Sequence, residues 1–330
     1  MRLLQTVRST IRKLTGRPRV SLALAGGGCK AFFALGVGHV LLRSGLDIRR
    51  ISGTSAGSAM AMCLLSDSAE ESVRYFCAIT RRNPSNFYWS RLLRGRRPWP
   101  HERMYRNTIT SYTDFDRIQR SKIELAVNAL RVPAKYQGLA SYWQRYHLMG
   151  RIIAAYQREM RYAAQGIYRP CMRAIAQEVG LEEQIFTKAD LNTPRKLADI
   201  VLAASSIWPL LRFQQFESGE LYLDGGITNN LPVNALPRED FIIAVHYDDR
   251  RMTRYFYEQT GDDVGRQIYY IAPEQPLGIE TFDYANSDGV RRAFEAGQRA
   301  AMLHLPRVQD LLDQALTIPP ARPVSRRSAD

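Results

Sequence analysis

Apolar runs and glycine-rich turns alternate at the start of the chain. The run from Val20 to Ala25 predicts a buried strand, and a glycine loop separates it from a helical pattern over 30–43. The run from Ile48 to Ser52 predicts a second strand, and another glycine-containing turn leads into an apolar helix over 56–65. Strands that alternate with helices in this way predict an α/β fold with a parallel sheet.

The middle of the chain follows a different pattern. Residues 81–106 are rich in Arg, Trp, Tyr and Pro and predict a loop, whereas residues 122–130 predict a strand. Residues 137–180 predict helices with many aromatic side chains. This helical stretch could cap an active site rather than extend the sheet. We place it in an insertion over about 81–190.

The α/β pattern returns after residue 190. Helices are predicted over 197–204 and 290–303, and strands over 221–223, 241–246 and 267–271. One domain over 20–318 accounts for this pattern. The segment 319–330 is rich in Pro, Arg and Ser and is predicted to be disordered.

Residues 1–19 form a basic segment ahead of the first strand. Leu4, Val7, Ile11 and Leu14 recur at helical spacing and predict an amphipathic helix. A basic helix with an apolar face can lie on an anionic membrane. It can equally pack on the surface of its own domain, and the pattern leaves both interpretations open.

Charge narrows the classes of partner. The 330-residue chain carries a net charge of +14, which favours nucleic acid, a membrane surface or an acidic ligand. It has no uninterrupted apolar stretch of about 18 residues, so neither a membrane-spanning helix nor a signal peptide is predicted. The four cysteines lack metal-ligand spacing and the five histidines are scattered, which favours a reduced, cytoplasmic setting without a metal site.

The turn between the second strand and its helix contains a candidate nucleophile. Ser55 stands in the sequence Gly53-Thr-Ser-Ala-Gly57. A nucleophilic serine must project from a sharp strand-to-helix turn, which small neighbours permit, and the positive end of the helix lies beside it. The alternative is a tight turn with an incidental serine.

The first glycine loop is a candidate oxyanion hole. Acyl transfer places negative charge on a carbonyl oxygen, which backbone N–H groups can stabilise. The loop also matches the Gly-x-Gly-x-x-Ala form of a dinucleotide-binding fingerprint, with Asp47 as the ribose acid. That fingerprint needs the acid at the end of the second strand, and Asp47 precedes this strand. The predicted oxyanion-hole residues are Gly26, Gly27, Gly28, Cys29 and Lys30.

The serine also needs a base. None of the histidines stands in a recognisable motif, and His246, which follows a strand, is the positional candidate for a triad. Asp224 ends a short predicted strand and precedes Gly225 and Gly226. A carboxylate whose pKa is raised by burial can act as the base for a neighbouring serine, although Asp-Gly-Gly is also an ordinary turn.

Together these motifs resemble the patatin-like phospholipase family. Residues 26–31 resemble its oxyanion loop, 53–58 its nucleophile elbow and 224–232 its Asp motif. Residues 203–209 resemble its Ala- and Ser-rich stretch ahead of that Asp, and the order and spacing fit from about Val20 to Leu303. One departure is Ala31, where the family usually has Gly.

The resemblance implies a three-layer α/β/α fold with a mainly parallel central sheet and a helical insertion. It implies a Ser–Asp dyad in which Ser55 is the nucleophile and Asp224 the base, with the amides of Gly27 and Gly28 forming most of the oxyanion hole. Lys30 takes the family's basic position. The implied reaction is hydrolysis of fatty-acyl esters of lipids through an acyl-enzyme, without metal or cofactor. A catalytically silent membrane- or nucleotide-binding module on the same fold is the alternative.

The middle segment suggests where the protein meets lipid. Trp favours the membrane interface and Arg pairs with phosphate, so the candidates are Trp89, Trp99, Arg94, Arg96 and Arg97. The same mixture can bind nucleic acid, but the chain has no nucleic-acid motif. We therefore predict a cytoplasmic protein that is peripheral on an anionic membrane, and no nucleic-acid partner; an ordinary cap layer remains the alternative for this segment.

Overall fold

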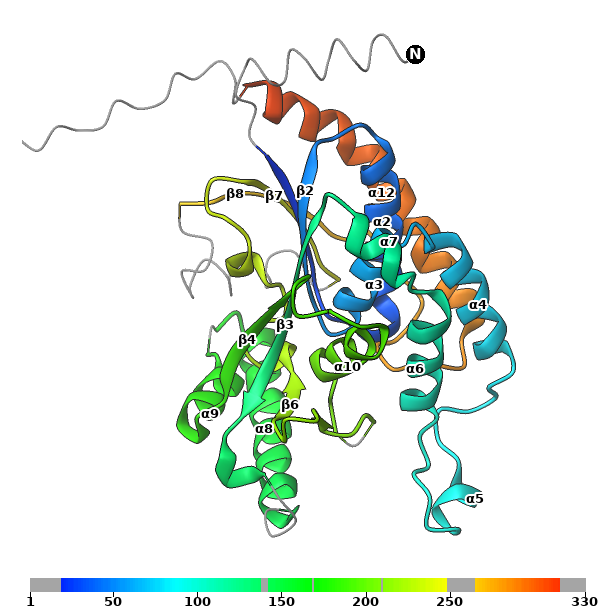
Figure 1. Cartoon of the computed structure of the whole chain (residues 1–330), viewed down its shortest axis with the longest axis vertical. Coiled ribbons are helices and arrows are strands. Elements are labelled where there is room, and N and C mark those ends of the chain that lie inside the picture. Colours follow the sequence, from blue (N-terminus) through cyan, green and yellow to red (C-terminus); the bar gives the residue numbers. More distant parts are fainter. Residues whose placement is uncertain (1–18, 138–141, 168, 209, 248–264, 315–330) are drawn as a thin grey trace, which may run out of the picture.

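The computed structural model describes residues 19–137, 142–167, 169–208, 210–247 and 265–314 (Figure 1). The helix predicted within residues 1–19 and the tail predicted over 319–330 lie outside the described residues, except for Arg19. The described part is built around one mixed sheet with helices on both faces, which confirms the predicted α/β class.

Five strands of the sheet run parallel. They are β1 (Val20–Leu24), β2 (Ile48–Thr54), β3 (Glu124–Val132), β7 (Phe241–Val245) and β8 (Gln267–Ile271), arranged in the order β3-β2-β1-β7-β8. Every residue of β1 and β7 is buried, as expected for central strands covered on both faces. The parallel pairing of β1 and β2 brings the two glycine-containing turns to the same edge of the sheet.

The antiparallel strands extend the sheet beyond β3. They are β4 (Glu182–Thr187), β5 (Gln214–Gln215) and β6 (Leu221–Asp224). β4 pairs along one edge of β3, while β2 and β6 pair with successive parts of the other edge. Thr54 is the partner of Asn128, and Asp224 is the partner of the next residue, Ala129. Because β2 and β6 run toward each other along β3, their carboxyl ends meet.

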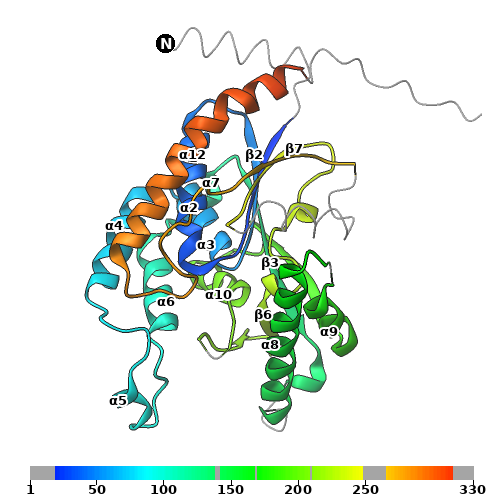
Figure 2. The ribbon, with the colours of Figure 1, turned by 180° about the vertical axis from the view of Figure 1, so that it is seen from behind.

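Most helices cover one face of the sheet (Figures 1 and 2). They are α2 (Phe32–Arg43), α3 (Ala56–Leu65), α4 (Ala69–Arg81), α6 (His101–Tyr112), α7 (Phe115–Arg120), α10 (Pro194–Ala204) and α12 (Ser287–Gln314). α8 (Tyr142–Ala164) and α9 (Cys171–Val179) pack on the other face against β3 and β6 through a separate apolar cluster. The short helix α5 (Trp89–Leu92) projects away from the body (Figure 1).

The middle of the chain differs from the expectations in two places. The strand predicted over 122–130 is present as β3, but β4 was not predicted and also belongs to the sheet. β4 escapes recognition because it starts with two exposed glutamates and shows no buried alternation. The range 81–106 is not a loop throughout: it holds α5 and the start of α6, whose buried face lies mostly beyond residue 103.

Candidate active site

Ser55 lies at a sharp turn between β2 and α3. Its φ of 53° and ψ of −131° lie in a region that residues other than glycine rarely adopt. The residue stands immediately ahead of the first turn of α3, and Ser58 fixes the turn by donating from its amide and its hydroxyl to the Ser55 carbonyl, at 3.0 and 2.5 Å. The backbone strain and the helix start are the features expected of a nucleophile elbow.

The glycines at this elbow permit close packing. A Cβ placed on Gly57 would lie 2.3 Å from the carbonyl oxygen of Leu24 in β1. A Cβ on Gly53 would lie 2.7 Å from the carbonyl group of Gly57. The first turn of α3 therefore rests directly on the strand ends, which places Ser55 at the carboxyl edge of the sheet.

Ser55 contacts the predicted carboxylate. Its Oγ donates to Asp224 Oδ2 at 2.6 Å, across 169 residues of sequence. The other carboxylate oxygen, Oδ1, accepts from the amide of Gly226 at 2.7 Å, and the Asp224 amide donates to the Ser206 carbonyl. Both the side chain and the backbone of Asp224 are thus fixed, so that one oxygen faces the serine.

The surroundings of Asp224 set its protonation. Burial raises the pKa of this carboxyl from 3.8 to about 6, and the hydrogen bonds from Ser55 and Gly226 oppose that shift only in part. The carboxylate is therefore mostly ionised at neutral pH, yet it is more basic than an exposed aspartate. This is the combination that a general base for a hydroxyl requires.

Asn128 connects the serine and aspartate turns, and we did not predict it. Its Nδ2 donates to the carbonyl of Asn229 at 3.0 Å and approaches the Thr54 hydroxyl and the Gly225 carbonyl at 3.3 and 3.4 Å. A Cβ on Gly225 would lie 2.6 Å from this Nδ2, so the turn after Asp224 needs a glycine there. The sequence contains a signal for this role, because Asn128 is a polar residue in the middle of the apolar segment that forms β3. The structure buries it fully, and a buried amide needs hydrogen-bond partners.

The glycine loop lies beside Ser55, but only part of it offers free amides. The amide of Gly26 donates to the Asn230 carbonyl, that of Cys29 to the Thr281 carbonyl, and that of Lys30 to the Gly27 carbonyl. The amides of Gly27 and Gly28 donate to no other residue in the part of the chain that the structure describes. Of the five predicted oxyanion-hole residues, Gly27 and Gly28 therefore keep their amides available, and these are the two that the family resemblance implies form most of the hole.

The other loop side chains have separate contacts. Lys30 Nζ lies 3.6 Å from a carboxylate oxygen of Glu280. The thiol of Cys29 donates to the Asp283 carbonyl at 3.4 Å, and burial holds the pKa of this thiol well above its usual value. Both residues thus attach the glycine loop to the segment 280–283, which makes them supports for the loop rather than amide donors.

A variant of Gly28 tests the loop. Gly28 has a φ of +53°, and a Cβ there would lie 1.9 Å from the Thr281 carbonyl oxygen. We expect Gly28→Ala to displace the loop and lower kcat for ester hydrolysis about a hundredfold, as loss of an oxyanion donor does. The control is Gly45→Ala, which also has positive φ but nothing within 4 Å of the added carbon. Equal activity of the two variants would contradict the assignment of the loop.

Neither alternative arrangement is present. His246 is buried beside the ring of Tyr270, and no histidine contacts Ser55 among the residues that the structure describes. Asp47 pairs with Arg49 at the amino end of β2, whereas the glycine loop follows the carboxyl end of β1. Asp47 therefore lies at the amino ends of the parallel strands, whereas the loop lies at their carboxyl ends. This separation excludes the role of Asp47 as the ribose acid of a dinucleotide site.

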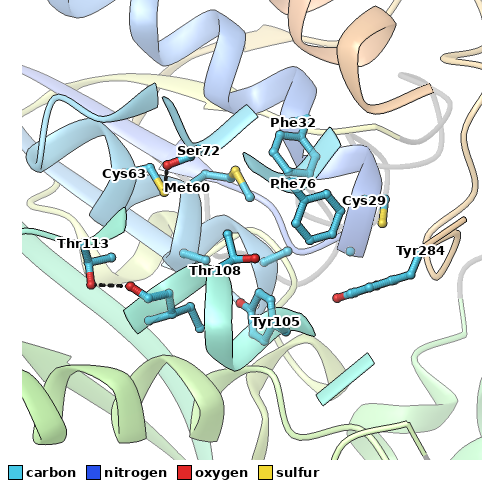
Figure 3. A pocket seen from close by; sticks show the side chains of 14 residues that line it. Cys29, Phe32, Met60, Cys63, Ser72, Phe76, Tyr105, Thr108, Thr113 and Tyr284 are labelled. Atoms are coloured by element: carbon cyan, nitrogen blue, oxygen red, sulfur yellow. Dashed lines mark hydrogen bonds between the residues drawn. The ribbon is translucent and has the colours of Figure 1, made fainter. Parts of the chain in front are cut away.

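An apolar pocket lies next to the glycine loop and the start of α3. Gly28 from the loop and Ala56, the residue after Ser55, line one part of it. The pocket continues along α3 to Cys63, about two helical turns further on. Large side chains from α2, α4, α6 and the segment before α12 complete its walls: Ile109 and, labelled in Figure 3, Phe32, Phe76, Tyr105 and Tyr284.

Comparison with known proteins identifies the family. A family model described as patatin-like phospholipase matches residues 22–237, a range that contains the elbow, the glycine loop and Asp224. The chain belongs to the patatin-like phospholipase family. Membership supports lipid hydrolysis as the general activity and lipids as the substrate class. No curated protein sequence matches this patatin-like chain.

The solved structures that resemble this patatin-like protein include two that match it over most of its length. One is VipD from Legionella pneumophila, at 14% identity and a TM-score of 0.40, with 90% of this chain and 67% of that chain covered. The other is the type III effector protein ExoU, at 15% identity and a TM-score of 0.35, with 88% of this chain and 53% of that chain covered. The chain thus spans two thirds of the length of one structure and about half of the other.

The residues that the structure describes contain no group of three or more His, Cys, Asp and Glu side chains arranged to hold a metal ion. Within the same residues, no helix is long and apolar enough to cross a membrane.

Proposed function

We propose that this protein hydrolyses fatty-acyl esters of phospholipids or related lipids, with Ser55 as nucleophile and Asp224 as base. The observation that carries the proposal is the 2.6 Å hydrogen bond from the Ser55 hydroxyl to the buried Asp224 carboxylate at a strained elbow. Family membership supports the lipid substrate.

The reaction follows from these positions. As Ser55 Oγ attacks the ester carbonyl carbon, its proton passes to Asp224, and the carbonyl electrons move to oxygen. The amides of Gly27 and Gly28 stabilise that oxyanion. When the intermediate collapses, the alcohol leaves with the proton from Asp224, and the acyl group remains on Ser55. Asp224 then deprotonates a water molecule, whose attack releases the fatty acid and restores the serine.

The apolar pocket supplies a site for the acyl chain. Gly28 of the glycine loop and Ala56 in the first turn of α3 both line it, and its lining is almost entirely apolar. Burial of a hydrocarbon chain there gains about 0.8 kcal/mol per methylene. We therefore assign the acyl half of the ester to this pocket and the alcohol half to the open side of Ser55.

Narrowing the pocket tests that assignment. Ala59 lines it one helical turn beyond Ala56. We expect Ala59→Leu to lower kcat/KM for long-chain nitrophenyl esters about tenfold or more, because added carbon in a packed site costs about 1–3 kcal/mol. Hydrolysis of the acetyl ester by the same variant should change little. An equal loss on all chain lengths would place the acyl chain elsewhere.

Fatty-acid release tests the proposed activity as a whole. The wild-type protein is incubated with phospholipid vesicles, and released fatty acid is measured beside the Ser55→Ala variant. Release by the wild type alone supports the proposal. Tight vesicle binding without release by either protein would instead support the catalytically silent module. The cytoplasmic, membrane-peripheral location inferred from the sequence stays a prediction.

A further inference from the structure

Residues 83–100 form a projecting hairpin around α5, which we name the α5 hairpin. Figures 1 and 2 show it extending from the body beside α6. The amide of Tyr88 donates to the Pro98 carbonyl and joins the two arms. The ring of Phe87 packs against Trp89 and Trp99, with centroids 4.8 and 5.7 Å apart. The hairpin therefore has its own small aromatic core and a defined shape.

The tip of the hairpin exposes large apolar side chains. Leu93 is 87% exposed and Trp89 is 70% exposed. Another exposed tryptophan, Trp143 at 81%, belongs to the first turn of α8. Both views place the α5 hairpin and the start of α8 at the same end of the molecule. Apolar side chains that share one projecting end are typical of an interaction surface.

The charge of the same tip is uniformly positive. Arg91, Arg94 and Arg96 surround Leu93, and the sequence contains no Asp or Glu from residue 72 to residue 100. Arg97 pairs with Glu102, but the other three arginines form no ion pair with any residue that the structure describes. Their charges complement an anionic surface.

We propose that the α5 hairpin docks the protein on an anionic lipid bilayer. Trp89 and Leu93 enter the interface, and Arg91, Arg94 and Arg96 contact lipid phosphates. An exposed leucine at the apex favours hydrocarbon over nucleic acid, since an aliphatic side chain offers a base neither stacking nor a hydrogen bond. The proposal rests on the proposed function only for the idea that the bound lipid is also the substrate.

The base of the hairpin is attached to the active-site pocket. Asn83 Nδ2 donates to the Tyr284 carbonyl at 2.8 Å, and the Tyr284 amide donates to Asn86 Oδ1 at 2.8 Å. Tyr284 lines the acyl pocket, and the nearby Thr281 carbonyl accepts from the amide of Cys29 in the glycine loop. A bilayer bound at the hairpin tip would thus contact an element whose base is hydrogen-bonded to a residue of the pocket wall, Tyr284.

Vesicle binding in the Ser55→Ala background tests docking without turnover. One variant adds Trp89→Ser and Leu93→Ser, and another adds Arg91→Gln, Arg94→Gln and Arg96→Gln. Binding is measured by sedimentation with vesicles of phosphatidylglycerol and phosphatidylcholine. We expect the apolar variant to bind about tenfold or more weakly. The arginine variant should bind roughly a hundredfold more weakly, and its affinity should depend less on salt.

Matched controls come from α12, whose carboxyl end lies at the opposite end of the molecule (Figure 1). Met302 and Leu303 are 57% and 62% exposed, and Met302→Ser with Leu303→Ser removes a comparable apolar pair. Arg292→Gln, Arg299→Gln and Arg307→Gln remove three exposed positive charges. Docking by the hairpin predicts that these controls bind vesicles like the Ser55→Ala protein.

Equal binding by the hairpin variants and the controls would overturn the proposal. So would binding of a single-stranded oligonucleotide by the wild type in place of vesicles. With Ser55 intact, the hairpin variants should hydrolyse a soluble short-chain ester at the wild-type rate while losing hydrolysis of vesicle lipid. Failure of the wild type on the soluble ester would contradict the proposed function alone, because the binding measurements need no turnover.

Discussion

The Ser55→Ala variant is expected to hydrolyse esters at least about 10⁴-fold more slowly than the wild type, as loss of a nucleophile does in serine hydrolases. The change removes the only atom that can form the acyl-enzyme in the proposed reaction. It also relieves Asp224 of its hydrogen bond from the hydroxyl but leaves the backbone of the elbow in place. The rate is best measured with a soluble short-chain ester, so that membrane binding does not limit it.

The matched control for this variant is Ser44→Ala. The Ser44 hydroxyl donates to the Leu41 carbonyl at the end of α2, at the far end of that helix from the glycine loop. The Ser44→Ala variant should retain the wild-type rate. Both Ser44→Ala and Ser55→Ala should keep the wild-type circular dichroism spectrum. A Ser55→Ala protein with most of its activity would show that the nucleophile lies elsewhere.

The Asp224→Asn variant is expected to lose about 10³- to 10⁴-fold in kcat, comparable to the loss of a triad member. Asparagine preserves size and can still accept from the Gly226 amide, but it cannot take the proton from Ser55. The loss should therefore appear in kcat more than in KM, because the acyl pocket is unchanged. A kcat within tenfold of the wild type would exclude Asp224 as the base.

The pH dependence of the wild type provides an independent test of the same residue. The base must be ionised, and burial raises the pKa of Asp224 to about 6. Activity should therefore fall as the pH drops through about 6 and level off above it. The residual activity of Asp224→Asn should not show this fall near pH 6. A wild-type profile flat down to pH 4 would contradict a buried aspartate base.

The raised pKa also has a consequence for stability. The folded protein holds the Asp224 proton more tightly than the unfolded chain does, so this group favours the folded state at low pH. That contribution is lost as the pH rises from 3.8 through about 6. At pH 8 the ionised, buried carboxylate should lower stability by up to about 3 kcal/mol. Asp224→Asn should therefore unfold at a higher temperature than the wild type at pH 8, and with little difference at pH 4.

The sequence identifies the serine elbow and its glycine loop for local reasons. An apolar run marks β1, Ile48 and Ile51 mark β2, and the glycines mark sharp turns after each strand. Parallel pairing of consecutive strands then brings both turns to one edge of the sheet. The local pattern offers Asp224 only as a candidate base, because it ends a predicted strand before two glycines. The resemblance to the family is what names it as the partner of Ser55.

The position of Asp224 depends on tertiary structure. β3 extends beyond β2, and β6 pairs with that extension in the antiparallel direction. Thr54 at the end of β2 pairs with Asn128, and Asp224 at the end of β6 pairs with the next residue, Ala129. The two turns therefore lie side by side. This arrangement depends on β3 pairing with both β2 and β6. The strand itself is predicted over 122–130, but its pairing with these two strands is not. Register over such distances is not encoded in the periodicity of either strand.

Which amides of the glycine loop are free likewise depends on hydrogen bonds to residues far away in the sequence. The motif offers five residues as oxyanion donors, each with a backbone N–H, and the family resemblance implies that Gly27 and Gly28 form most of the hole. Contacts with Thr281, Asn230 and Gly27 engage three of those amides, and two of these partners lie more than 200 residues away in the chain. Sequence spacing therefore predicts the loop, while long-range hydrogen bonds decide which amides can face a substrate.

The most direct test of the central claim, an activated Ser55 nucleophile, is labelling with a fluorophosphonate probe followed by mass spectrometry of the labelled peptide. The account predicts that the wild type is labelled at Ser55, that Asp224→Asn is labelled much more slowly, and that Ser55→Ala is not labelled. A wild-type protein that resists the probe, or a Ser55→Ala protein that is labelled as fast as the wild type, would contradict it.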